Sequence, residues 1–137
     1  MKISHDLKLR VRYEETDQMG VVHHSKYIIY YEAARSALMR SLGVSYAEME
    51  ARGVMMPLLD VQSKYLWPAY FEEELTIRVM VSEEPMARAT FHYEVYNEAG
   101  RLINTGMTVL GFIRSDTRRP CRVPQWFVEL LKQHTCE

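Results

Sequence analysis

Residues 15–43, ETDQMGVVHHSKYIIYYEAARSALMRSLG, decide the fold of this chain. A short polar loop leads into a long segment, residues 27–42, that is apolar apart from a narrow polar remainder. A segment of this length exceeds an ordinary strand, and Gly43 suits the left-handed conformation that often ends a helix. We therefore predict a helix over residues 27–42 that is buried around most of its circumference.

Composition and charge place the chain among ordinary globular domains. The 137 residues fit one domain, residues 1–137, and 47% of them are hydrophobic. The predicted helix carries Glu32, Arg35 and Arg40 and is shorter than the roughly 20 apolar residues that cross a bilayer, so it is not a membrane span. The net charge of -1 argues against a nucleic-acid partner, which normally requires a strongly basic face.

The cysteines and the N-terminus bear on the cellular compartment. Cys121 and Cys136 have no spacing typical of a zinc site or of a disulfide framework, and the first residues contain no apolar run of signal-peptide length. Free thiols persist in a reducing compartment. We therefore expect a cytoplasmic protein that uses no metal or other cofactor.

The remainder of the chain is mainly strand-like, since it is rich in alternating, β-branched and aromatic residues. Gly100 marks a hairpin turn, and helices are predicted at residues 44–53, with a capping box at Ser45 and Glu48, and at 123–134. The predicted strands are residues 8–14, 58–67, 75–81, 87–97 and 102–114. Because successive strands are usually antiparallel neighbours, we predict an α+β fold, one five-stranded antiparallel sheet wrapped around one long central helix.

Two stretches resemble the hotdog-fold thioesterases of the 4-hydroxybenzoyl-CoA thioesterase family. Residues 10–35, RVRYEETDQMGVVHHSKYIIYYEAAR, are similar to the family signature with its D-x-x-G-V-V segment, and residues 64–77, KYLWPAYFEEELTI, are similar to a second family stretch. The similarity extends over residues 7–129. The nearest branch is that of the bacterial acyl-CoA thioesterases associated with the Tol-Pal cell-envelope system. This chain departs from that branch at His23, where an aromatic residue is common.

The resemblance implies an enzyme that hydrolyses an acyl-CoA thioester to a free acid and coenzyme A. It also implies a homodimer whose two sheets join edge to edge, often paired again into a homotetramer, with active sites at the dimer interface. Neither the acyl group nor the carrier, coenzyme A or acyl carrier protein, follows from the sequence. The choice between dimer and tetramer also stays open.

Asp17 is the candidate catalytic carboxylate. It would attack the thioester carbonyl directly or deprotonate an attacking water, and the thiol is a good leaving group. The resemblance places the oxyanion donor at the backbone amide of His24, near the start of the buried helix, where unpaired N–H groups carry partial positive charge. The residue types alone also fit a role for Asp17 in stabilising a turn.

Other residues offer alternatives to this assignment. Glu32 lies on the helix that carries the catalytic carboxylate in some other hotdog thioesterases, although a buried ion pair with Arg35 is the stronger prediction for it. The adjacent His23 and His24 point about 100° apart on a helix and rarely share a metal. The side chain of His24 is a further candidate for orienting water or lining the pocket.

The substrate-binding candidates are chosen by charge and position. Coenzyme A phosphates favour Lys or Arg at the mouth of a site. The candidates are Lys64 and Arg88, with Arg88 preferred by resemblance to the family, and also Arg114, Arg118 and Arg119 after the last predicted strand. Gly20 marks a backbone turn or a close approach in the polar loop. Tyr27 faces either the pocket or a neighbouring subunit, and the sequence does not decide which.

Two other functions compete with hydrolysis. A hotdog dehydratase typically carries a His-Phe-Pro type loop, and this sequence lacks one. A non-catalytic acyl-CoA or acyl-carrier-protein binding protein, or a scaffold of the same fold, would bind the thioester without releasing a thiol.

Overall fold

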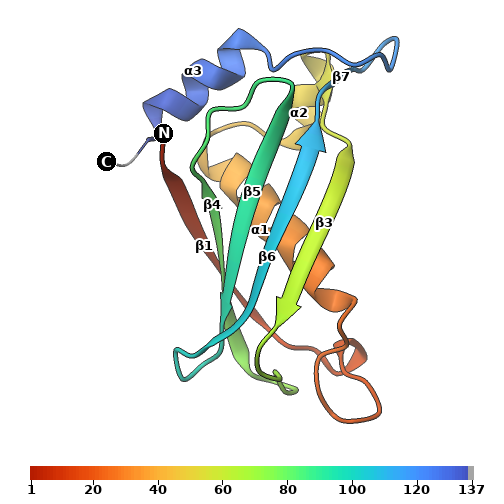
Figure 1. The fold of residues 1–137 in the computed structure, drawn as a ribbon, viewed down its shortest axis with the longest axis vertical. Coiled ribbons are helices and arrows are strands. Elements are labelled where there is room, and N and C mark those ends of the chain that lie inside the picture. The colour runs from red at the N-terminus through yellow and green to blue at the C-terminus, as the bar shows by residue number, and fades with distance from the viewer. Residues whose placement is uncertain (136–137) are drawn as a thin grey trace.

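A long helix packed on one face of a curved antiparallel sheet forms the body of the protein (Figure 1). The computed structural model describes residues 1–135. The helix and the sheet strands are α1 (Lys26–Ser41), β1 (Ile3–Arg10), β3 (Leu58–Tyr65), β4 (Glu74–Val81), β5 (Arg88–Tyr96) and β6 (Leu102–Gly111). The strand order is β1-β4-β5-β6-β3, so β1 and β3 are the edges. The predicted α+β hotdog fold is confirmed.

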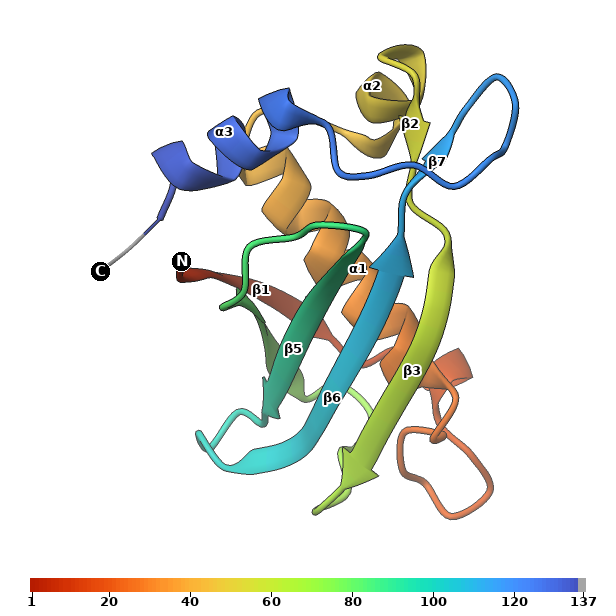
Figure 2. The ribbon, with the colours of Figure 1, turned by 45° about the horizontal axis from the view of Figure 1, so that its top comes forward.

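Shorter elements lie at the two ends of the sheet. They are the 3-10 helix η1 (Tyr13–Glu15), α2 (Tyr46–Ala51), the paired two-residue strands β2 (Val54–Met55) and β7 (Ile113–Arg114), and α3 (Gln125–Gln133). Figure 2 shows α2, α3 and the β2–β7 pair together at one end, and the loop that precedes α1 at the other. No helix in residues 1–135 has the length and apolar character needed to cross a membrane.

The first and last predicted strands have different bounds in the structure. The first was predicted at residues 8–14, but β1 is Ile3–Arg10 and pairs along its whole length with β4. The chain then turns into η1, because the backbone N–H of Arg12 donates to the Glu15 carboxylate at 2.8 Å. The last, predicted at residues 102–114, ends at Gly111, and the residues after it form β7 against β2.

The interface between α1 and the sheet contains buried polar side chains as well as apolar ones. Tyr31 of α1 is fully buried, and its ring stacks on Tyr93 of β5 with 4.3 Å between centroids. Its hydroxyl bonds to Ser63 of β3 at 2.8 Å and donates to the side chain of Asn104 of β6. These bonds fix the helix against particular residues of the sheet, since a buried hydroxyl left without a partner costs free energy.

Gly106 of β6 makes room for this arrangement. A Cβ at this position would lie 2.3 Å from Cζ of Tyr31, a separation that real Cβ atoms do not reach. The ring is held by stacking and by hydrogen bonds and cannot simply swing away. The absence of a side chain at Gly106 is therefore a packing requirement of α1.

We predict that Gly106→Ala destabilises the protein by about 1–3 kcal/mol or more, because overpacking forces a buried ring or the backbone to move. Urea unfolding at a fixed protomer concentration measures the difference. Gly111→Ala is the matched control in the same strand, since its Cβ would meet only the exposed side chain of Leu59 at 3.2 Å. Equal stability of Gly106→Ala and the parent protein would contradict the packing requirement.

Candidate active site

Asp17 lies in a tight loop immediately before α1. Its Oδ1 accepts from the backbone N–H of Met19 at 2.9 Å and of Val21 at 3.4 Å, and its own N–H donates to the carbonyl oxygen of Val21 at 2.8 Å. Gly20 completes the turn with a φ of 80°, which glycine adopts without strain. The carboxylate is half-buried, and within residues 1–135 its Oδ2 accepts no hydrogen bond. One oxygen therefore fixes the side chain and the other is available to a ligand.

The backbone of His24 presents an N–H group close to the start of α1. None of the described residues accepts a hydrogen bond from this N–H, whereas the neighbouring N–H of His23 donates to the carbonyl oxygen of Glu15 at 2.9 Å. The carbonyl oxygen of His24 is held by the hydroxyl of Tyr65 at 2.9 Å. Tyr65 thus holds the peptide that follows His24, while the N–H of His24, which lies in the preceding peptide, stays free at the positive end of the helix dipole.

Asp17, His24 and Tyr27 line one cavity of about 350 Å³. The other wall comes from the end of β3 and the segment after it, including Tyr65, Leu66 and Pro68. Tyr27 is buried. This burial, and to a smaller extent the nearby Tyr31, raises the pKa of its hydroxyl to about 12, so the hydroxyl stays neutral at physiological pH. The cavity brings a carboxylate and a free backbone N–H to one mostly apolar space. This combination can attack a carbonyl group and stabilise the oxyanion that forms.

Glu15 is a site residue that sequence reasoning missed. Glu15 is 6% exposed, and its carboxylate accepts from the hydroxyl of Tyr30 at 2.9 Å and from the Arg12 side chain at 3.1 Å. Through these bonds it ties the chain before Asp17 to α1. The three-residue spacing of Arg12 and Glu15 is a signal that could have indicated this contact, but residues 8–14 were predicted as a strand, in which that spacing has no such meaning.

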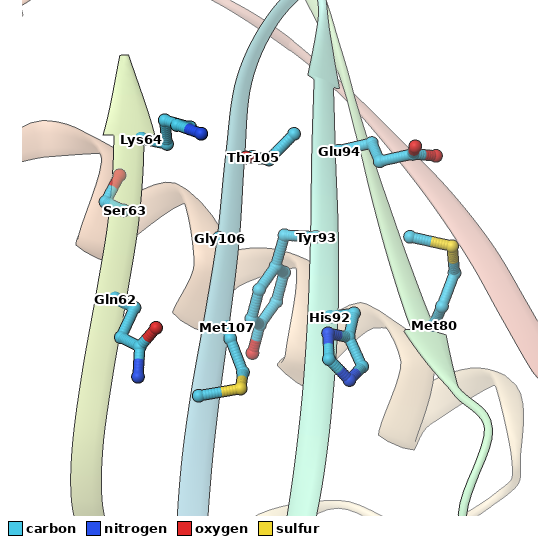
Figure 3. A pocket seen from close by; sticks show the side chains of 10 residues that line it. All are labelled: Gln62, Ser63, Lys64, Met80, His92, Tyr93, Glu94, Thr105, Gly106 and Met107. Atoms are coloured by element: carbon cyan, nitrogen blue, oxygen red, sulfur yellow. The ribbon is translucent and has the colours of Figure 1, made fainter.

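Lys64 and Arg88 lie away from this cavity within one chain. Lys64 lines a separate cavity of about 580 Å³ on the sheet face opposite α1, together with Gln62, Thr105 and Met107 (Figure 3). Arg88 is exposed at the start of β5, and β5 begins at the end of the sheet far from the Asp17 loop (Figure 1). One copy of the chain therefore brings together Asp17, His24, Tyr27 and the Gly20 turn, but neither cationic residue.

The remaining candidates have structural surroundings. The predicted pair of Glu32 and Arg35 is wrong: Glu32 is exposed, while buried Arg35 donates to the hydroxyls of Tyr46 at 3.2 Å and Tyr93 at 3.1 Å. The rings of His23 and His24 lie with their centroids 4.0 Å apart. No cluster of three metal-ligating side chains exists among residues 1–135. Cys136 lies outside the described residues, and Cys121 has a free thiol.

Comparison with known proteins places this geometry in a family. The model of the thioesterase-like superfamily matches residues 11–131. The chain belongs to this superfamily. The chain is similar to the crystal structure of a DHNA-CoA thioesterase from Staphylococcus aureus, which superposes with a TM-score of 0.88 at 34% identity, covering 96% of this chain and 90% of that one. The resemblance predicted from residues 10–35 and 64–77 is thus confirmed.

Two thioesterase-like relatives are similar in sequence. YneP of Bacillus subtilis, provisionally named an acyl-CoA thioesterase, is 36% identical over 69% of this chain and 69% of its own length. The acyl-CoA thioester hydrolase YbgC of Escherichia coli is 26% identical over 91% of this chain and 93% of its own. Each alignment covers more than two thirds of this chain and more than two thirds of the relative.

We predict that Glu15 makes stability depend on pH below 4.5. Burial raises its pKa, but hydrogen bonds from the Arg12 backbone, the Tyr30 hydroxyl and the Arg12 side chain together hold it below its ordinary value of 4.5. The folded state therefore binds fewer protons than the unfolded state. The stabilisation is complete above pH 4.5 and is lost as the pH falls through the lower, folded-state pKa.

The free energy of unfolding in urea is measured between about pH 3 and pH 6 for the parent protein and for Glu15→Gln. The stability advantage of the parent should shrink as the pH falls. Glu14→Gln is the matched control, because the Glu14 side chain is exposed and lies 3.5 Å from the same Arg12. Parallel pH profiles of the parent and Glu15→Gln would refute a role for this carboxylate.

Proposed function

We propose that the protein is an acyl-CoA thioesterase that hydrolyses a thioester to a carboxylic acid and coenzyme A, with Asp17 and the His24 amide as its catalytic groups. The observation that carries the proposal is the shared cavity, in which a half-buried carboxylate and an unbonded N–H stand at the start of a buried helix. The family and the named activities of its relatives support the same reaction.

In this mechanism the thioester carbonyl oxygen accepts from the N–H of His24. Oδ2 of Asp17 either attacks the carbonyl carbon or removes a proton from a water that attacks it, and both routes give a tetrahedral oxyanion. The oxyanion then collapses, the C–S bond breaks and the thiolate leaves with its electron pair. Attack by water gives the carboxylic acid at once, whereas direct attack leaves an anhydride, which water hydrolyses to the acid and the free Asp17 carboxylate. A thiol pKa near roughly 8.5 lets it leave with little help from an acid. Oδ1 stays bound to the Met19 amide throughout and keeps the carboxylate in place.

Replacing Asp17 by Asn should lower kcat by about 10²- to 10⁴-fold, since Asn cannot act as a base and is a poor nucleophile. The Asn side-chain oxygen can still accept from Met19, so the fold is retained. Thiol release with a thiol-reactive dye, across short, long and aromatic acyl-CoAs, measures the loss. Asp6→Asn is the control, because Asp6 is on the far edge strand β1 and pairs with Arg78 at 2.9 Å. Unchanged thiol release by Asp17→Asn would disprove the assignment, and acyl-CoA binding without release by the parent would favour a binding protein.

The second part of the proposal is a homodimer formed through the edge strand β3. Large apolar side chains are exposed along β3, the residues after it and the first turn of α1, at Ile28, Ile29, Leu58, Leu59, Tyr65 and Leu66. An unpaired edge with an apolar surface favours association with another strand. A second copy fits because a twofold axis lets β3 pair antiparallel with itself.

The dimer also bears on coenzyme A. In an antiparallel junction of the two β3 strands, the two sheets run in opposite directions. The sheet end that carries Arg88 in one protomer then lies on the same side as the Asp17 loop of its partner. Arg88 and Lys64 then remain candidates for binding the phosphates of coenzyme A, or of acyl carrier protein, across the interface. A cytoplasmic location is proposed on the free thiol of Cys121.

Ile29→Glu should raise the dimer dissociation constant by at least about tenfold, because a charge would be buried without a partner at the interface. Ile29 is 50% exposed on α1 in the single chain. Sedimentation over a range of protein concentrations measures the constant. Met86→Glu is the control, since Met86 is 57% exposed in the segment before β5, away from β3. A parent protein that sediments as a monomer at all concentrations would rule out the dimer.

A further inference from the structure

Arg101 is an exposed cation at the edge of the candidate active site. It lies in the turn between β5 and β6, and its guanidinium carbon is 3.6 Å from the centroid of the Trp67 ring. A guanidinium in this position is attracted by the negative charge on the face of the ring. Trp67 lines the Asp17 cavity and is 45% exposed, so it lies where that cavity opens to solvent. The chain that carries Asp17 therefore also brings a positive charge to the cavity opening.

Backbone hydrogen bonds hold Arg101 and Trp67 in place. The N–H of Arg101 donates to the side-chain oxygen of Asn97 at 2.9 Å, and its carbonyl oxygen accepts from the N–H of Asn97 at 2.9 Å. The N–H groups of Leu66 and Trp67 both donate to the carbonyl oxygen of Ile103, at 2.9 and 3.1 Å. These bonds join the segment after β3 to the start of β6, so the ring and the guanidinium are carried by connected backbones.

The charge of Arg101 is not neutralised by the protein. Within residues 1–135 its side chain makes no ion pair and donates no hydrogen bond. Glu98, three residues earlier in the same turn, is instead 3.7 Å from Arg10 and accepts from the backbone N–H of Glu74 at 3.0 Å. Stacking uses only the face of the guanidinium, so its in-plane N–H groups remain available. Their planar arrangement matches the oxygens of a phosphate group.

The position of Arg101 differs from that of the cations that the sequence suggested. Lys64 is on the sheet face opposite α1 and Arg88 is at the far end of the sheet, whereas the β5–β6 turn lies at the same end as the loop before α1 (Figures 1 and 2). A thioester whose carbonyl lies at Asp17 extends its phosphate-bearing part into solvent, since burying unpaired charge is costly. A path out of the cavity along Trp67 leads to Arg101.

We infer that Arg101, held on the Trp67 ring, binds phosphate groups of coenzyme A in the same protomer that supplies Asp17. This inference rests on the proposed function and adds a binding residue for the thiol carrier. Arg101 does not line the cavity that holds the reacting carbonyl. It therefore stabilises the bound substrate and the transition state equally, so its removal changes KM and not kcat.

Arg101→Ala should raise KM for an acyl-CoA by about five- to tenfold at low ionic strength and leave kcat within about twofold, because a charge-assisted phosphate contact is lost. The pantetheine thioester of the same acid has no phosphate, so its KM should be the same for the variant and the parent. Added salt should reduce the difference seen with acyl-CoA. Arg40→Ala is the matched control, since Arg40 is exposed in the last turn of α1, at the opposite end of the helix from the Asp17 loop.

Titration calorimetry with free coenzyme A tests the same contact without turnover. The dissociation constant should rise for Arg101→Ala by a factor similar to that of KM and stay unchanged for Arg40→Ala. Unchanged coenzyme A binding by Arg101→Ala would overturn the inference, as would an equal rise in KM for the pantetheine thioester. Full activity of Asp17→Asn would instead refute the proposed function, and the calorimetric result would still decide whether Arg101 binds coenzyme A.

Discussion

The burial of a helix that carries hydroxyl groups on its covered face is the constraint on which the rest of the structure depends. A buried hydroxyl without a partner costs about 1–3 kcal/mol, so α1 cannot slide along the sheet as a purely apolar helix could. The hydroxyl of Tyr31 forms hydrogen bonds with Ser63 and Asn104 on two neighbouring strands, and the hydroxyl of Tyr30 donates to Glu15. Gly106 leaves the space that the Tyr31 ring occupies. The helix therefore has one position relative to the sheet.

That position determines the geometry of the candidate site. The hydrogen bond between Tyr30 and Glu15 joins α1 to the chain before Asp17, so it ties the loop to the helix. The sheet adds a second anchor, since Tyr65 of β3 binds the His24 carbonyl oxygen and leaves the N–H free. A catalytic carboxylate and an oxyanion donor need fixed separation and orientation. In the candidate site, Asp17 is held by the Met19 and Val21 amides and His24 by Tyr65, all of which line the cavity, whereas the Glu15–Tyr30 contact lies outside it.

The same layer arrangement leaves the edge strand β3 with one side that no other strand of residues 1–135 covers. With β1 at one edge and β3 at the other, only β3 is accompanied by a run of exposed apolar side chains that continues onto α1. This exposed edge is the basis of the homodimer proposed above.

The sequence by itself determined the elements of the fold, because hydrophobic period, β-branched runs, Gly43 and Gly100 act locally. It also singled out Asp17, Gly20 and His24 through a motif of adjacent residues. Only the tertiary structure decided where β1 ends, that Arg35 binds tyrosine hydroxyls instead of Glu32, and that Glu15 is buried. Lys64 lies apart from the Asp17 cavity because its side chain is on the sheet face opposite α1, and Arg88 lies apart because β5 begins at the far end of the sheet. Each of these depends on contacts between residues far apart in the chain, and local patterns do not encode the direction or the partner of such contacts.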